Sequence, residues 1–404
     1  MDSADVIVFG GGMVGLALAA ALDSSGLSVI VIDPADPAPR LTIAFDGRTS
    51  AVSSSSMRML EAIGVTAHLA APGCPIRRIA VADGLDPGGL QFDADDDEAL
   101  GWMHENRHVR AALQARAEAG KNIALHWKSQ VVSVDRGEFG VTVTLAGGKQ
   151  AKAPLLVAAD GRNSATREQA GIRLARWQYD HHAIVSVLRH QHSHDHVAYE
   201  IFYPDGPFAL LPMTDDEGGH RSAIVWSVQE ADAPGWMALS DADFAAEAKA
   251  AMGGFLGEVS LLTPRSSYPL GFHHSAKITA HRLALAGDAA HAIHPIAGQG
   301  LNLGFRDAAA LAQVLVEGAR LGLDLGDRQL LDRYERWRAL DAWSVAVATD
   351  SLTRIYGIPG KTASAVRRLG MGLVARIAPL RDQLKNEARG TSGELPLLLR
   401  GLPI

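Results

Sequence analysis

The order of apolar and polar positions at the start of the chain predicts a strand, a helix and a second strand. Residues 5–9 (DVIVF) and 28–32 (SVIVI) are short apolar runs, which are typical of buried parallel strands. The pattern between them predicts a helix over residues 13–25. Together these segments predict a β-strand, α-helix, β-strand unit.

The same periodicities predict elements further along the chain. Residues 180–268 contain alternating segments, and two of them flank the turn PDGP at 204–207, which indicates an antiparallel sheet. After the apolar run at 283–286 the chain becomes mainly helical. We predict helices over 107–119 and 301–321 and strands over 131–134, 141–145, 155–159, 199–203 and 208–213.

Residues 76–99 differ in character from their surroundings. They are rich in Gly, Pro and Asp and end in the acidic run DADDDE at 93–98. This composition predicts an exposed excursion from the core, with a solvated acidic loop at its end.

Composition narrows the class of protein. Among 404 residues, 47% are hydrophobic and 21% charged, as in globular proteins, and the net charge of −7 argues against nucleic-acid binding. Cys74 is the only cysteine, which excludes an intramolecular disulfide and favours a reducing, cytoplasmic compartment. The acidic start argues against a secretory signal, and no uncharged apolar run reaches about 18 residues, so we expect any membrane contact to be peripheral.

A glycine-rich motif follows the first predicted strand. Residues 10–15 (GGGMVG) match G-x-G-x-x-G between a strand and a helix, the context that a dinucleotide requires. Gly10 would permit the turn, Gly12 the approach of a pyrophosphate, and Gly15 close packing of the helix. Asp33 ends the second strand, 23 residues after Gly10, where a carboxylate can bind the adenosine ribose. These features predict dinucleotide binding but leave NAD and FAD open.

Two later strand ends favour FAD. The apolar strand at 155–159 is followed by Asp160-Gly161, and the strand at 283–286 is followed by Gly287-Asp288. Ligands of open α/β sheets bind beyond the carboxyl ends of the strands, so both acids can reach one extended cofactor. We predict that Asp288 binds ribityl hydroxyls of FAD.

The segment after Asp288 leads into a helix through residues 295–302 (PIAGQGLN). The first N–H groups of this helix would face negative charge developing at the flavin. Asn302 could instead serve only as a helix cap, as Asn often does.

Together these residues resemble the aromatic-ring hydroxylase class of flavoprotein monooxygenases, and specifically its ubiquinone-biosynthesis branch, the 2-polyprenyl-6-methoxyphenol hydroxylases. The branch is indicated by DGRTSA at 46–51, ENR at 105–107, DGPFALLP at 205–212 and HAIHPIAGQGLNLG at 291–304. The resemblance spans nearly the whole chain. The ribose acid of the family is commonly Glu, whereas this chain has Asp33.

The resemblance implies an α/β fold with a Rossmann-like FAD-binding domain, an inserted substrate domain on a mainly antiparallel β-sheet, and C-terminal helices. We place the FAD-binding domain at 1–75, 100–178 and 270–330, the substrate domain at 76–99 and 179–269, and the C-terminal helical region at 331–404. The implied reaction inserts one oxygen atom of O2 into the ring of a polyprenylated phenol through a flavin C4a-hydroperoxide. NAD(P)H or another electron donor would act as a transient reductant, since no second G-x-G-x-x-G follows a strand.

The flavin would carry the reaction, so we assign no essential acid–base residue. The candidates at the flavin edge are His291, His294 and Pro295. The predicted cofactor-binding residues are Gly10, Gly12, Met13, Val14, Gly15, Asp33, Arg48, Asn106, Arg107, Val132, Asp160, Gly161, Gly287, Asp288, Pro295, Gly298, Gly300, Leu301 and Asn302. The predicted substrate wall is Tyr199, Ile201, Tyr203, Phe208, Leu210 and Pro212, although ordinary sheet alternation would give the same pattern.

Two further patterns suggest binding to other partners. His190, His192, His194 and His196 alternate, but the segment resembles a loop without cysteine, so we predict no required metal. An apolar helical stripe is expected near the C-terminus, within residues 361–389, which hold seven basic and two acidic side chains. This stripe could contact an anionic membrane, and the enzyme would then be a peripheral protein of its inner face. Alternatively, the stripe could pack against the body of the protein.

Two alternatives to hydroxylation stay open. One is a flavin-dependent reductase or dehydrogenase of a prenyl or quinone substrate that inserts no oxygen. The other is a non-catalytic flavoprotein that serves as a scaffold for a ubiquinone-biosynthesis complex.

Overall fold

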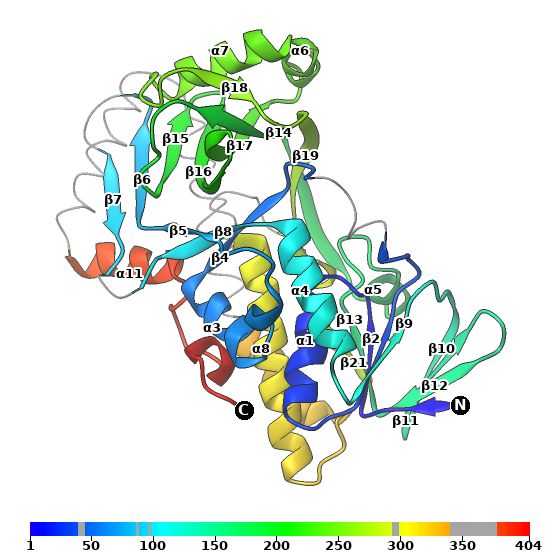
Figure 1. Ribbon diagram of the computed structural model, residues 1–404. Coiled ribbons are helices and arrows are strands. Elements are labelled where there is room, and N and C mark those ends of the chain that lie inside the picture. Colours follow the sequence, from blue (N-terminus) through cyan, green and yellow to red (C-terminus); the bar gives the residue numbers. More distant parts are fainter. Residues whose placement is uncertain (39–44, 86–88, 96–97, 293–298, 340–377) are drawn as a thin grey trace.

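A computed structural model describes residues 1–38, 45–85, 89–95, 98–292, 299–339 and 378–404. Its central layer is a six-stranded sheet that is parallel except at one edge (Figure 1). Its inner strands consist of Val, Ile, Leu, Phe and Ala and are buried on both faces. In spatial order the strands are β20 (Thr279–Ala280), β21 (Leu283–Leu285), β13 (Leu155–Ala158), β2 (Val6–Phe9), β3 (Val29–Ile32) and β9 (Ile123–His126).

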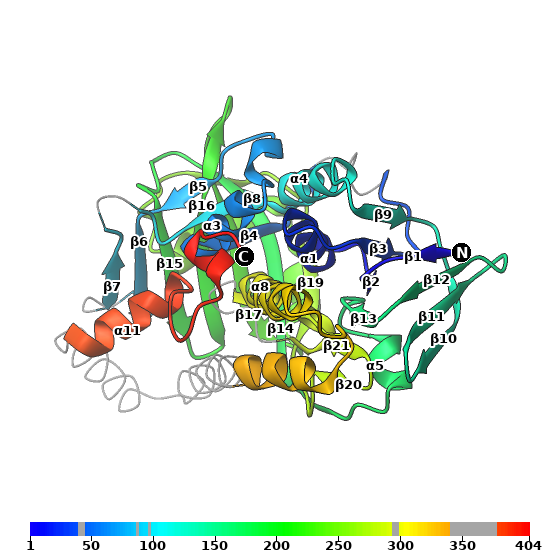
Figure 2. The same ribbon diagram turned by 90° about the horizontal axis from the view of Figure 1, so that it is seen from below.

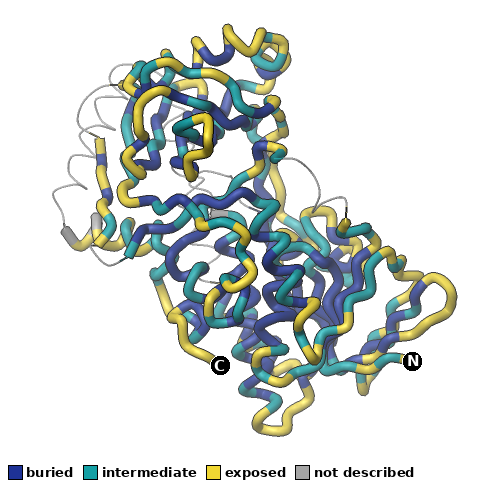
Figure 3. Tube along the Cα trace, in the orientation of Figure 1, coloured by how far each residue is buried: buried dark blue, intermediate teal, exposed yellow. Residues whose placement is uncertain are grey.

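Helices cover this sheet. Helix α1 (Met13–Ser24) lies between α4 (Asn106–Glu118) and α8 (Gln299–Arg320) and contacts both (Figure 2). The buried part of the trace follows the sheet, α1 and α8, whereas hairpin tips are exposed (Figure 3). The core of this region therefore fixes the positions of the loops at the strand ends.

A four-stranded sheet flanks the central layer. Its order is β1 (Asp2–Ser3), β12 (Gln150–Ala153), β11 (Gly140–Leu145) and β10 (Val131–Gly137).

The largest sheet has nine strands and is mainly antiparallel. At one edge, β6 (Arg78–Asp83) pairs in parallel with β15 (Val197–Tyr203). The helices α6 (Ala233–Ala238) and α7 (Asp241–Ala251) lie against one face (Figure 1). In order the strands are β22 (His291–Ala292), β19 (Ser266–Ser275), β14 (Leu174–His190), β17 (Gly219–Gln229), β16 (Gly206–Asp216), β15 (Val197–Tyr203), β6 (Arg78–Asp83) and β7 (Leu90–Asp93), while β18 (Val259–Leu261) pairs with β14.

A small three-stranded sheet connects the two large ones. Its order is β4 (Thr49–Ser53), β8 (Gly101–Glu105) and β5 (Cys74–Ile76). Ser53 ends β4 and caps the next helix, because its hydroxyl accepts the Ser56 N–H. The remaining elements are α3 (Ser54–Ala62), η1 (Thr66–His68), α5 (Ala165–Gln169), η2 (Gly287–Ala289), α11 (Ala378–Ala388) and η4 (Leu397–Arg400).

The fold is the mixed α/β architecture that the sequence predicts, and the predicted strands and helices differ from the observed ones by a few residues at their ends. The prediction for residues 76–99 was wrong in one respect. Residues 78–83 and 90–93 form β6 and β7 of the nine-stranded sheet rather than an exposed excursion, and Leu90 and Phe92 are buried. Leu90 and Phe92 alternate with polar residues, which is a strand signal that the Gly, Pro and Asp content obscured.

The acidic residues after β7 form ion pairs with the C-terminal helix. Asp95 contacts Lys385 at 2.6 Å and also Arg389, which contacts Glu98 as well. None of the described helices is long and apolar enough to cross a membrane.

Candidate functional site

A cavity of about 450 Å³ lies where the carboxyl ends of β2, β13 and β21 meet the nine-stranded sheet. It combines residues of the predicted dinucleotide site with residues of β15, β16 and β17. The lining residues are Gly12, Met13, Val14, Thr49, Ser50, Ala51, Ala159, Gly161, Arg162, Glu200, Ala209, Leu211, Val225, Tyr268, Ala286, Asp288, Ala292, Gly300 and Leu301.

The three motif glycines have different surroundings. A Cβ on Gly10, whose φ is +103°, would lie 2.2 Å from the carbonyl oxygen of Ala159. A Cβ on Gly15 would lie 2.0 Å from the carbonyl oxygen of Gly10. Apart from its chain neighbours, no atom of the described residues lies within 4 Å of the corresponding position on Gly12. Gly10 and Gly15 thus allow close packing, while Gly12 leaves its face of the loop open to the cavity.

Helix α1 begins at this loop, beside the cavity. Gly12 is its N-cap and supplies no side-chain acceptor, and the first turn holds no acidic residue. Met13 and Val14 of this turn line the cavity. A helix start of this kind leaves donors and a positive dipole end available to an anion such as a pyrophosphate.

Asp33 lies at the end of β3 beside the glycine loop. Its Oδ2 accepts the Gly11 N–H at 2.7 Å, and its Oδ1 accepts the Ala35 N–H at 2.7 Å. Its side chain does not line the cavity. In the structure its carboxylate therefore stabilises the loop conformation.

Asp160 follows β13. Its Oδ2 accepts the Thr166 hydroxyl at 2.8 Å, whereas its Oδ1 is buried and has no partner among the described residues. Buried carboxylate oxygens normally have hydrogen-bond partners, so this atom is suited to a ligand that supplies a donor. The next two residues, Gly161 and Arg162, line the cavity.

The Gly287-Asp288 turn follows β21. Asp288 lines the cavity, and burial raises the pKa of its carboxyl above the ordinary value. Gly287, with a φ of +61°, donates its N–H to Asp307 Oδ2 of α8 at 2.8 Å. The turn is therefore held by the helix that starts beside the same cavity.

The start of α8 contributes backbone and side chains in different ways. Gly300 and Leu301 line the cavity. The Asn302 side chain instead binds β4, because its Oδ1 accepts the Ser53 N–H and its Nδ2 donates to the Ala51 carbonyl, both at 2.9 Å. Its amide thus joins α8 to β4, which neither the cofactor role nor the helix-cap role anticipated.

Only some residues of the DGR and ENR motifs line a cavity. Arg48 and Asn106 line a second cavity of about 390 Å³, which shares Thr49, Val225 and Tyr268 with the first. Arg107 lies outside both and forms an ion pair with Glu105 at 2.7 Å. The structure thus brings Arg48 and Asn106, but not the Arg107 guanidinium, toward the site.

Other predicted residues lie away from the cavity or outside the described residues. Val132 is 69% exposed on the edge strand β10 and lines neither cavity. His291 is buried, with its Nε2 2.8 Å from Asp307 Oδ2. His294, Pro295 and Gly298 lie outside the residues that the structure describes.

The predicted substrate wall lies on the other face of its sheet. Ile201, Phe208 and Leu210 pack in the core beneath α6 and α7, and Tyr199 and Tyr203 pack against that core. Pro212 pairs with Ser222 on the same face and lines neither cavity. The side chains alternate between the two faces of the strands, as predicted. Both faces of this sheet are covered, however, so periodicity alone could not say which face meets the cavity.

The cavity face of these strands carries residues that the sequence analysis did not select. They are Glu200 on β15, Ala209 and Leu211 on β16, and Val225 on β17. Arg162 and Tyr268 were also missed. Arg162 directly follows the Asp160-Gly161 pair, a signal that could have found it, whereas nothing local marks Tyr268 or Glu200.

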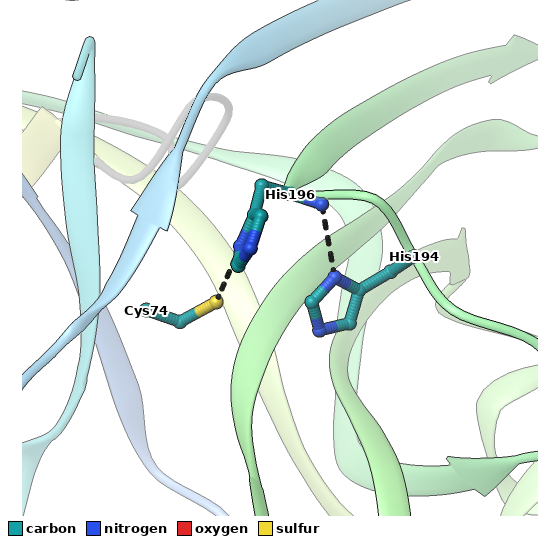
Figure 4. A group of neighbouring side chains, drawn as sticks. All are labelled: Cys74, His194 and His196. Carbon is teal, nitrogen blue, oxygen red and sulfur yellow. Dashed lines mark hydrogen bonds between the residues drawn. The ribbon is translucent and has the colours of Figure 1, made fainter.

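A second cluster joins the histidine-rich loop to Cys74 (Figure 4). Possible ligand atoms of Cys74, His194 and His196 lie within 4.8 Å of one another. His194 Nδ1 accepts the His196 N–H at 3.1 Å, and its Nε2 lies 2.9 Å from the Met213 carbonyl oxygen. Burial raises the pKa of the Cys74 thiol to about 12, which disfavours the thiolate that binds metals. The absence of a required metal stays a prediction, although its premise that no cysteine lies nearby was wrong.

The main cavity fits an extended dinucleotide such as FAD. It has an open glycine face at Gly12, the starts of two helices and the carboxyl of Asp288 at one strand end. Asp160, whose Oδ1 has no partner among the described residues, directly precedes the lining residue Gly161. The N–H groups at the helix starts are donors for phosphates, and the carboxylates are acceptors for hydroxyls.

Comparison with known proteins agrees with this geometry. The model of the FAD binding domain family matches residues 3–349. The ubiquinone hydroxylase UbiL of Rhodospirillum rubrum is 41% identical over 99% of this chain and 94% of its own length. The 3-demethoxyubiquinol 3-hydroxylase of Escherichia coli is 32% identical over 96% of this chain and 98% of its own.

Solved structures show the same fold at lower identity. The p-nitrophenol 4-monooxygenase PnpA of Pseudomonas putida superposes with a TM-score of 0.77 at 19% identity, over 98% of this chain and all of that one. From its sequence relatives and its site, the chain belongs to the FAD-dependent hydroxylases of ubiquinone biosynthesis.

Proposed function

We propose that this protein inserts one oxygen atom of O2 into the ring of a polyprenylated phenol, with NAD(P)H or another donor as reductant. The observation that supports this most is the single cavity that joins the cofactor residues Gly12 and Asp288 to the apolar wall of Ala209, Leu211 and Val225. An apolar wall next to a cofactor suits a prenylated ring and excludes water from the reaction.

The protein would bind FAD through the Gly12 loop, the start of α1 and the acids at 160 and 288. Bound FAD would supply the activation of O2. The start of α8 at Gly300 would place its positive dipole end beside negative charge on the reduced ring. The division into an FAD-binding domain and an inserted substrate domain is part of this proposal.

The decisive experiment separates hydroxylation from its two alternatives. Enzyme reduced anaerobically by NAD(P)H, or by dithionite, is mixed with a short-chain 2-prenylphenol before and after oxygen is admitted. We expect hydroxylated product only after oxygen. Turnover without oxygen would instead establish a reductase, and a normal flavin spectrum without any turnover would favour a scaffold.

We also propose that the enzyme works in the cytoplasm, peripherally on the inner face of a membrane and in a biosynthetic complex. The motivation is the basic C-terminal segment, with seven basic and two acidic residues between 361 and 389. Lys385 and Arg389 are engaged with Asp95 and Glu98, so these two cations are not the membrane contact. The stripe residues Val366, Leu369, Leu373, Val374 and Ile377 lie outside the described residues, and nothing is described of the Leu380 side chain.

Flotation with vesicles of phosphatidylglycerol and phosphatidylcholine tests the membrane proposal. We expect binding that weakens as salt rises, because a basic segment attracts anionic lipid. A chain truncated after Val366 that still contains FAD and binds the vesicles equally well would contradict it.

A further inference from the structure

Among the described residues, the wall that β15, β16 and β17 form in the main cavity carries one carboxyl group. Glu200 of β15 pairs with Ala209 of β16 on one side and with Val81 of β6 on the other. Its side chain lies on the cavity face, together with Ala209, Leu211 and Val225. The wall that would receive an apolar ring therefore contains a single acid.

The remaining charged or titratable groups of this cavity lie on other elements. Arg162 and Asp288 follow β13 and β21, at the strand ends that form the proposed cofactor site, and Tyr268 is on β19. No hydrogen bond or ion pair of the Glu200 carboxyl occurs among the described residues. Glu200 is half-buried, and a partly desolvated carboxyl without a protein partner suggests that a ligand provides one.

The surroundings also adjust the acidity of this group. Burial raises the pKa of Glu200 to about 7, and no charged neighbour contributes to this change. A base is most effective when its pKa lies near the working pH, because it is then both available and strong enough to accept a proton.

We propose that Glu200 is a catalytic residue that binds the hydroxyl of the phenolic substrate and accepts its proton. In this step the phenol O–H bond breaks and an O–H bond forms on the Glu200 carboxylate. The electron pair stays on the phenol oxygen, so the ring becomes richer in electrons and more reactive toward an electrophilic oxygen. The proton leaves Glu200 to solvent when the product departs. This inference rests on the proposed function, because it assumes a phenolic substrate.

The placement also explains why an acid occupies an otherwise apolar wall. An unpaired carboxyl in an apolar site has a cost in stability, and such groups concentrate at functional sites. A ring held against Leu211 and Val225 can present its hydroxyl to Glu200 while its reacting carbon faces the cofactor side of the same cavity.

The test uses the FAD-loaded enzyme and its Glu200→Gln and Glu200→Asp variants, with Glu258→Gln at an exposed site as the control. A 2-prenylphenol and its methyl ether, which has no acidic proton, are the probes. Ultraviolet difference spectra give phenol binding and ionisation between pH 5 and 9 without turnover. Rapid mixing gives flavin reduction and product formation separately.

In the parent enzyme and in Glu258→Gln we expect a pH step near 7 in phenol ionisation, and preference for the phenol over its methyl ether. Glu200→Gln should lose both and form product on the order of 100-fold more slowly, as for removal of a general base, with flavin content and reduction unchanged. Glu200→Asp should keep the pH step.

An unchanged pH step and unchanged preference in Glu200→Gln would overturn the role of Glu200. That result is distinct from failure of the proposed function, in which the parent enzyme itself would hydroxylate neither this phenol nor other quinone precursors. If Glu200→Gln does not retain FAD, Glu200→Asp decides, since loss of the pH step in a folded carboxylate variant would also overturn the role.

Discussion

Arg338 donates its Nε–H to Asp307 Oδ1 at 2.7 Å, and the two side chains are only 1% and 0% exposed. The other oxygen of Asp307 accepts the Gly287 N–H and lies 2.8 Å from His291 Nε2. A fully buried carboxylate of α8 thus holds the turn that carries Asp288. Breaking a buried charge pair is costly because the remaining charge loses its partner.

We therefore expect Asp307→Asn to lower the free energy of unfolding by about 3–5 kcal/mol and to weaken FAD binding. Burial raises the pKa of Asp307, but His291 and Arg338 outweigh burial and hold the pKa below its ordinary value. The contribution of the ionised carboxylate to stability is therefore present at neutral pH and is lost only as pH falls through that lowered pKa. Denaturant unfolding at pH 7 measures the effect. Glu317→Gln, at a partly exposed ion pair of the same helix, is the control, and an equal effect there would contradict the prediction.

The glycine loop gives a contrasting pair of substitutions. Gly12→Ala places a methyl group in open space, so the stability of the apoprotein should be unchanged. FAD affinity should fall about 10-fold or more, because the methyl group keeps the pyrophosphate away from the backbone. Gly15→Ala meets the Gly10 carbonyl and should instead destabilise the apoprotein by about 1–3 kcal/mol. Thermal unfolding of apoprotein and FAD titration separate the two effects. Equal loss of apoprotein stability in both variants would show that Gly12 is needed for folding.

Asn302 should act through structure. Asn302→Ala removes two hydrogen bonds to β4 and leaves a backbone N–H and a carbonyl unsatisfied, for a loss of about 1–3 kcal/mol. Asn302→Asp can still accept the Ser53 N–H but cannot donate to Ala51, so it should restore only part of the stability. Full stability in Asn302→Ala, measured by denaturant unfolding, would mean that the β4 contact contributes little.

The raised pKa of Glu200 has its own consequence for stability. Because the folded state binds this proton more tightly, the stabilising contribution is fully present below about pH 4.5 and is lost as pH rises through about 7. Glu200→Gln should therefore equal the parent in stability near pH 4.5 and exceed it at pH 8, by about 1–3 kcal/mol. Unfolding curves at the two pH values test this, and a variant of lower stability at pH 8 would contradict it.

The Cys74 cluster leads to a prediction about metal content. Since His194 already uses both ring nitrogens in contacts with the backbone, we expect no stoichiometric transition metal in purified enzyme and no loss of hydroxylation after treatment with a chelator. Elemental analysis decides the first point. One tightly bound metal ion per chain that is lost in Cys74→Ser would overturn the prediction.

Local patterns in the sequence were enough to predict the central sheet and the loops at its strand ends. Short apolar runs at 6–9 and 155–158, each followed by Gly or Asp, are typical of buried parallel strands, and the turns after them depend on residues within a few positions. Local patterns of this kind do not depend on what packs against them.

The face of β15 and β16 that meets the cavity, and the contacts of Asn302 and Cys74, depend on tertiary packing. Both faces of β15 and β16 are covered, so the alternation along these strands could not say whether the face of Glu200 or that of Ile201 meets the cavity. Asn302 and Ser53 are separated by 249 positions, and Cys74 and His196 by 122. Contacts over such separations arise from the packing of whole sheets and helices, which local periodicity does not specify.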